Sequence, residues 1–163
     1  MERRFLAEAD QYFEEYLRKI RECAALLSEE QVWWRPNEAV NSVGNLLLHL
    51  RGNLSQWVVA ALGGQPFERH RAEEFRARGG VARAELLAGL EETVRSVRAV
   101  IAGLDGSALE RRHVVQGCDT DGLGIVFHVV EHMSYHTGQI VATTKQLTGP
   151  QAGIEFYPQH RGE

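Results

Sequence analysis

Apolar side chains recur every three or four residues along four stretches of the chain, the period of an amphipathic helix. The first stretch covers about residues 2–28, with these apolar positions on one helix face: Phe5, Ala9, Tyr12, Tyr16, Ile20, Cys23 and Leu27. The second follows the connection Trp33-Trp34-Arg35-Pro36 and runs to Leu62. Asn41 or Ser42 is its predicted N-cap, and Gly63-Gly64 ends it.

The C-terminal half predicts two further helices. The third buries a face made of Leu86, Leu90, Val94, Val97, Ile101 and Leu104, and it ends at Gly103 and Gly106. The fourth is capped by Asp119 or Thr120 and continues to Leu147, before Thr148-Gly149-Pro150 ends it. Residues 63–80 are bracketed by paired glycines and rich in both charges, which indicates a long connection with one short helical turn.

No alternating strand pattern and no Asn-Gly hairpin signal separates these segments. Four long amphipathic helices therefore predict an all-α fold, a four-helix bundle. A chain of 163 residues has the length of one domain, so we expect residues 1–163 to form a single bundle domain. The tail from Gln151, with Phe156 and Tyr157, is expected to pack back on the bundle and then to fray.

The composition excludes several classes of protein. Apolar residues make up 44% of the chain and charged residues 25%, as in soluble globular proteins. The formal net charge is −4, and acidic and basic residues are mixed along the chain, so the sequence has no basic patch of the kind that binds nucleic acid. Cys23 and Cys118 form no CxxC pair, which argues against disulfides and favours a cytoplasmic location. The acidic N-terminal segment is unlike a signal peptide and no stretch reaches membrane-spanning length, so we expect no membrane partner.

The segment HVVEHMSYHTGQI carries His128, His132 and His136 at intervals of four residues. On a helix these side chains share one face, with adjacent members ~6 Å apart. The outer two are separated by a rise of ~12 Å, too far for imidazole bonds of ~2.0–2.1 Å to one ion. A metal site here therefore uses His128 with His132, or His132 with His136, and needs a further ligand from elsewhere.

His49 is the candidate for that ligand. It lies in the apolar run NSVGNLLLHLRGNLSQW, with Asn45 and Asn53 four residues to either side and Gln56 a turn further on. Burying these groups without partners costs about 1–3 kcal/mol each, so we expect a ligand or a hydrogen-bond network. A single histidine on an apolar helix is usually a packed core residue, and HxxxH without the glutamate of HExxH names no enzyme class. Three histidines in nine residues facing a fourth favour a metal site.

The runs NSVGNLLLHLRGNLSQWV and FHVVEHMSYHTGQIVATTKQLTG, with the WWRP turn, resemble the DinB-like (YfiT-like) superfamily of metalloenzymes over about residues 5–157. The resemblance implies a four-helix bundle, generally a homodimer, whose divalent ion is bound by His49, His132 and His136. His128, one turn earlier, is then a candidate to orient a ligand or to exchange protons. Many members carry arginine where this chain has Thr137, so their substrate contacts do not carry over.

Three neutral imidazoles leave at least one position open on an ion, as in catalytic sites. Such an ion can activate water for hydrolysis or hold a thiolate near an electrophile. The superfamily that the chain resembles includes enzymes that use a low-molecular-weight thiol cosubstrate, such as bacillithiol or mycothiol. The leading hypothesis is a divalent-metal-dependent enzyme for a small-molecule substrate, a thiol-dependent S-transferase or a hydrolase. Zinc, nickel, manganese and iron all accept three imidazoles. The alternative is a noncatalytic, stress-associated homodimer whose metal stabilises the bundle.

Other polar residues have two interpretations each. Glu131 is a candidate acid or base beside the site or an exposed carboxylate, and Asn45, Asn53 and Gln56 either contact a bound ligand or satisfy one another. Tyr135 is expected to pack at an interface.

The charged connection before the third helix also has two interpretations. Arg35 and the Arg69-His70-Arg71 patch could steer an anionic substrate, but a charge-balanced surface loop with Glu68, Glu73 and Glu74 is preferred. The remaining expectations are that Trp33 and Trp34 are core or pocket wall, that Cys118 is packing, and that His70, His113 and His160 are solvated.

Overall fold

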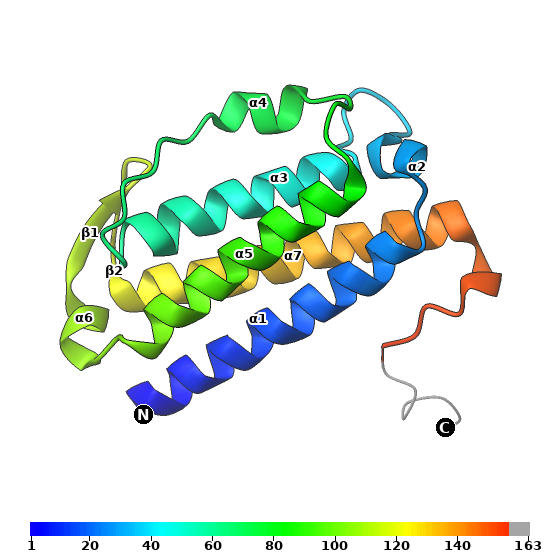
Figure 1. The fold of residues 1–163 in the computed structure, drawn as a ribbon. Coiled ribbons are helices and arrows are strands. Elements are labelled where there is room, and N and C mark those ends of the chain that lie inside the picture. Colours follow the sequence, from blue (N-terminus) through cyan, green and yellow to red (C-terminus); the bar gives the residue numbers. More distant parts are fainter. Residues whose placement is uncertain (157–163) are drawn as a thin grey trace.

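The computed structural model describes residues 1–156, and its four long helices form a bundle (Figure 1). They are α1 (Glu2–Ala25), α3 (Val43–Leu54) with its π-helical continuation η1 (Ser55–Ala60), α5 (Arg83–Ala102) and α7 (Gly122–Thr148). Helix α1 packs against α5 and α7, and α3 packs against the same two helices from the other side. The prediction of an all-α four-helix bundle is confirmed.

Short elements connect the bundle helices. They are α2 (Glu29–Trp33), α4 (Arg71–Arg76), α6 (Gly106–Glu110), the strands β1 (Arg112–Val115) and β2 (Cys118–Asp121), and a 3-10 turn η2 (Pro150–Ala152). Helix α4 is the single helical turn predicted within residues 63–80, and it lies against α3 on the side away from α1 (Figure 1). Within the described residues, no helix is both long and apolar enough to cross a membrane.

The core is built from the predicted apolar faces. Its fully buried side chains include Phe13, Ile20, Leu47, Leu50, Leu90, Ile125, Met133 and Ile140. The face of α1 is centred on Phe13, so Tyr12 lies at its edge, 43% exposed, and stacks on Tyr16. Phe156 packs against the core as predicted for the tail, whereas Tyr157 lies outside the described residues.

Helix boundaries follow capping chemistry. Ser42 is the N-cap of α3, where it forms a reciprocal capping box with Asn45, so Ser42 rather than Asn41 is the cap. Helix α2 was not predicted, although Ser28 and Gln31 form the same motif three residues apart. Helix α7 begins at Gly122, and its N-cap is Asp121, whose side chain accepts from the Gly124 N–H, so the predicted caps Asp119 and Thr120 are wrong.

The prediction of no strands is wrong for residues 112–121. Strands β1 and β2 pair antiparallel, and their turn places Gln116 and Gly117 at φ 53° and 78°. Two successive left-handed residues give the tight hairpin turn that suits twisted strands. Glutamine replaces the usual asparagine in that turn, and the strands are only four residues long, so the pattern carried little signal.

Several side chains differ from their predicted places. Trp33 packs over Gly44 and donates from Nε1 to the Val81 carbonyl oxygen at 3.2 Å, as a core residue should. Trp34, by contrast, is 38% exposed, and Cys118 is exposed rather than packed. The packing predicted for Cys118 is therefore wrong, and Trp34 is not a core residue.

Candidate metal centre

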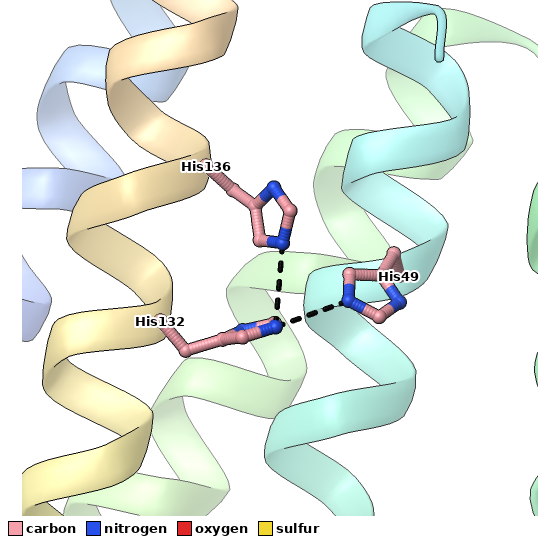
Figure 2. A group of neighbouring side chains, drawn as sticks. All are labelled: His49, His132 and His136. Atoms are coloured by element: carbon pink, nitrogen blue, oxygen red, sulfur yellow. Dashed lines mark hydrogen bonds between the residues drawn. The ribbon is translucent and has the colours of Figure 1, made fainter. Parts of the chain in front are cut away.

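Three histidine side chains from α3 and α7 converge between the two helices (Figure 2). His132 Nε2 lies 3.1 Å from His49 Nε2 and 3.3 Å from His136 Nε2. One ring nitrogen of each histidine lies within 4.8 Å of those of the other two. His49 and His136 are buried and His132 is half-buried. The structure therefore brings together the pair His132 and His136, one of the two pairs that the spacing left open.

The spacing of these nitrogens suits a shared cation. Bonds of about 2.0–2.1 Å at tetrahedral angles place two ligand nitrogens about 3.3 Å apart. The two Nε2 separations of 3.1 and 3.3 Å agree with that value. His128 lies outside the group: its ring is tilted against that of Trp57, with centroids 4.3 Å apart, and its centroid is 5.3 Å from that of His132.

The surroundings keep His132, His136 and the neighbouring His128 uncharged. Burial, with His136, His49, His128 and Arg69 nearby, lowers the pKa of His132 to about 3. Burial also lowers the pKa of His136, although Gln139 opposes the shift, and it lowers the pKa of His128 against the opposing charge of Glu131. Neutral imidazole is the form that ligates metals, so these side chains are ready to bind at neutral pH.

Glu74 and Arg69 orient His49 from the side opposite the other histidines. Glu74 Oε2 lies 3.0 Å from His49 Nδ1, and Arg69 donates to both carboxylate oxygens at 2.7 and 2.8 Å. Burial raises the pKa of Glu74, but the hydrogen bonds from Arg69 and His49 outweigh it and the net pKa is lowered. An ionised carboxylate only accepts, so His49 Nδ1 carries the proton and its Nε2 lone pair faces His132.

Arg69 Nη2 also approaches His49 Nδ1, at 3.1 Å. That contact and the one with Glu74 cannot both be hydrogen bonds, because Arg69 only donates and Nδ1 has one role in each tautomer. The carboxylate contact prevails, since Arg69 Nη2 already has Glu74 Oε2 as its acceptor at 2.8 Å.

Gln139 plays the corresponding part for His136. Its Oε1 lies 2.7 Å from His136 Nδ1, which places the proton on Nδ1 and directs Nε2 toward His132. Gln139 lies three residues after His136 on α7, a spacing that brings side chains together on a helix.

The sequence interpretation of the 63–80 connection as a solvated loop is wrong for Arg69 and Glu74. Their side chains are only 4% and 10% exposed. It holds for His70, which is exposed, and for Glu68. Arg35 pairs with Glu38 at 2.7 Å rather than with this network.

Asn45 has a structural role in the centre. Its Oδ1 closes the capping box with Ser42, and its Nδ2 donates to the carbonyl oxygens of Glu74 and Ala77 at 2.8 and 2.9 Å. Gln56 Oε1 accepts from Arg69 Nη1 at 3.2 Å and also from Gln116 Nε2. Asn45 and Gln56 therefore find most of their hydrogen-bond partners in α4 and the residues next to it.

Four buried polar atoms of α3, η1 and α7 have no hydrogen-bond partner among residues 1–156: Asn53 Oδ1, Trp57 Nε1, His128 Nε2 and His132 Nδ1. His113 Nε2 is also buried without a partner, so the prediction that His113 is solvated is wrong. His160 lies outside the described residues. Glu131 is exposed, and Tyr135 is 60% exposed with its ring 5.0 Å from that of His136.

Together, the fold and the site define an all-α bundle with a histidine triad between two of its helices. Residues 1–154 match the family described as "Protein of unknown function (DUF1572)", and the chain belongs to that family. No curated protein matches the chain significantly. A solved structure titled "Crystal structure of the conserved protein of locus from Enterococcus faecalis" is similar, with a TM-score of 0.73 and 14% identity over 88% of this chain and 96% of that one. At this identity the likeness shows the fold alone.

Proposed function

We propose that the protein is a divalent-metal-dependent enzyme of the DinB-like (YfiT-like) superfamily, and that His49, His132 and His136 bind its ion. The observation that carries the proposal is the convergence of three histidine nitrogens within 4.8 Å. The hydrogen bonds at Nδ1 of His49 and His136 support it, because metal-ligating histidines donate the other ring N–H in this way. Zinc, nickel, manganese and iron all suit this donor set.

Three protein ligands leave at least one coordination position for a substrate, which favours catalysis over a closed structural site. A divalent ion bound here supplies Lewis-acid chemistry, suited to hydrolysis or to stabilising a thiolate.

The charges of the centre favour an anionic partner. The lowered pKa values of His132 and His136 keep both side chains neutral, and Glu74, a buried carboxylate that contacts His49, is already paired with Arg69. The charge of a divalent ion is therefore not balanced by its protein ligands. A thiolate or carboxylate group of a small substrate balances it. This supports thiol-dependent transfer, with bacillithiol or mycothiol as the cosubstrate implied by resemblance, and places hydrolysis second.

A noncatalytic, stress-associated metal protein is the second candidate. His49 and His132 are 83 residues apart in sequence, so a shared ion links α3 to α7 and stabilises the bundle. A homodimer is supported by three exposed apolar side chains of α7: Leu123 at 49%, Phe127 at 63% and Tyr135 at 60%. A cytoplasmic location stays a prediction from the cysteine pattern.

Elemental analysis of purified protein without a histidine tag tests the ligand set. We expect about one divalent ion per chain, loss of that ion in His49→Ala, and retention in His70→Ala, an exposed histidine outside the triad. Full occupancy in His49→Ala would reject the ligand set.

Metal removal separates the two candidate functions. An intact fold that binds a thiol only when zinc is restored supports the enzyme. A large loss of thermal stability without thiol binding supports the structural role.

A further inference from the structure

Helix α4 and the loop before it bring a buried ion pair to the centre. Arg69 and Glu74 make two hydrogen bonds to each other, of 2.7 and 2.8 Å, and Glu74 Oε2 also lies 3.0 Å from His49 Nδ1. A buried ion pair contributes little net stability, because desolvation offsets the attraction. What this pair does fix is the orientation of the His49 imidazole and the ring nitrogen that carries its proton.

We propose that Glu74, held in place by Arg69, is a positioning residue that keeps His49 in its Nδ1-protonated tautomer and thereby sets the affinity of the centre for its ion. The inference rests on the proposed metal function. A carboxylate behind a ligating imidazole fixes the ring and makes the opposite nitrogen a stronger donor.

The surface of α3 is shaped to receive this carboxylate. A Cβ atom at Gly52 would lie 2.1 Å from Glu74 Oε1 and 3.0 Å from Arg69 Nε, so the pair approaches α3 only because residue 52 lacks a side chain. On the other side of His49, Asn45 holds the carbonyl oxygens of Glu74 and Ala77. Residues about one turn before and one turn after His49 therefore set the place of α4.

Arg69 is itself held from a third direction. Its Nη1 donates to Gln56 Oε1 at 3.2 Å, and the same oxygen accepts from Gln116 in the β1–β2 turn. Gln56 lies in the π-helical segment η1, a distortion that often occurs at functional sites. A continuous set of hydrogen bonds thus leads from the hairpin turn to the Nδ1 atom of His49.

The three histidines receive unequal support. His49 has a carboxylate behind it and His136 has the neutral amide of Gln139, whereas His132 Nδ1 has no partner among the described residues. His49 is therefore the strongest donor of the three. Loss of a group in the position of Glu74 typically weakens metal affinity about 10–100-fold.

The test measures the zinc affinity of the full-length chain by competition with a chromogenic chelator. Glu74→Gln keeps the shape but removes the charge. The double variant Arg69→Met/Glu74→Met removes both charges at once, a change that buried ion pairs commonly tolerate. We expect about 10–100-fold weaker zinc binding in the double variant and a smaller loss in Glu74→Gln. Glu73→Gln, an exposed neighbour on the same helix, is the matched control and should stay within about twofold of the wild type.

Nitrogen-15 NMR of the metal-free protein gives a readout that a purely structural role would not change. We expect the Nδ1–H tautomer of His49 in the wild type and a mixture of tautomers in the double variant. A folded double variant with unchanged tautomer and zinc affinity would overturn the positioning role. Absence of zinc binding by the wild type would reject the metal function instead, while the tautomer comparison would still decide whether Glu74 orients His49.

Discussion

Replacing Gly52 by alanine is the sharpest steric test of how α4 docks on α3. The added Cβ would lie 2.1 Å from Glu74 Oε1, whereas ordinary contact begins at 3.4 Å, so the carboxylate must retreat by about 1.3 Å. A shift of that size breaks its 2.7 Å hydrogen bond with Arg69. The substitution therefore disrupts a buried ion pair although it adds only a methyl group.

The expected cost combines two opposing contributions. A lost charge-assisted hydrogen bond costs about 1.5–3 kcal/mol, and a charge left buried without its partner adds to that. Alanine stabilises a helix interior relative to glycine by about 0.5–1 kcal/mol. We expect a net loss of about 2 kcal/mol, which lowers Tm by about 4–8 °C in a protein of this size.

Thermal and urea unfolding of the metal-free protein measures this change. Gly138→Ala on α7 is the matched control, because a Cβ there meets nothing within 4 Å and should raise the unfolding free energy by about 0.5–1 kcal/mol. If Gly52→Ala proved as stable as the wild type, the tight docking of Glu74 on α3 would be refuted.

Three further predictions concern stability. Asn45→Ala should cost about 2–4 kcal/mol in urea unfolding, because it removes the Oδ1 that accepts from the Ser42 N–H in the capping box and the Nδ2 that donates to the Glu74 carbonyl oxygen. Arg98→Ala, which breaks contacts of 2.6 and 3.0 Å with Asp10 between α5 and α1, should cost only about 0.5–1 kcal/mol and less in high salt, since the pair is over one-third exposed. The metal-free protein should lose unfolding free energy as pH falls from 6.5 to about 3: His132 has a pKa of about 3 when folded, so the unfolded chain binds more protons in that window. His132→Gln should flatten this dependence in urea unfolding at a series of pH values.

The long helices could be predicted from the sequence because their apolar faces extend over many turns. The histidines could be predicted too, since His49 interrupts an apolar run and the HxxxH spacing places His132 and His136 one turn apart on the same helix face. The hairpin could not, because its strands are four residues long and a glutamine occupies its left-handed turn position.

The ion pair behind His49 could not be predicted for a different reason. Arg69 and Glu74 lie in a segment whose charges resemble those of any solvated loop. Their burial depends on Gly52 and Asn45, more than fifteen residues earlier on α3. The one local signal was Gly52 itself, because an isolated glycine within a helical pattern often marks a close approach by another part of the chain.

The origin of the triad in distant parts of the chain has a consequence for assembly. His49 lies on α3 and the other two histidines lie on α7, after the paired glycines Gly79-Gly80. A chain divided at those glycines yields two fragments, each of which lacks part of the triad. Binding of a divalent ion by a mixture of the two fragments would therefore show that they assemble into one bundle. Neither fragment alone would bind the ion through the complete triad.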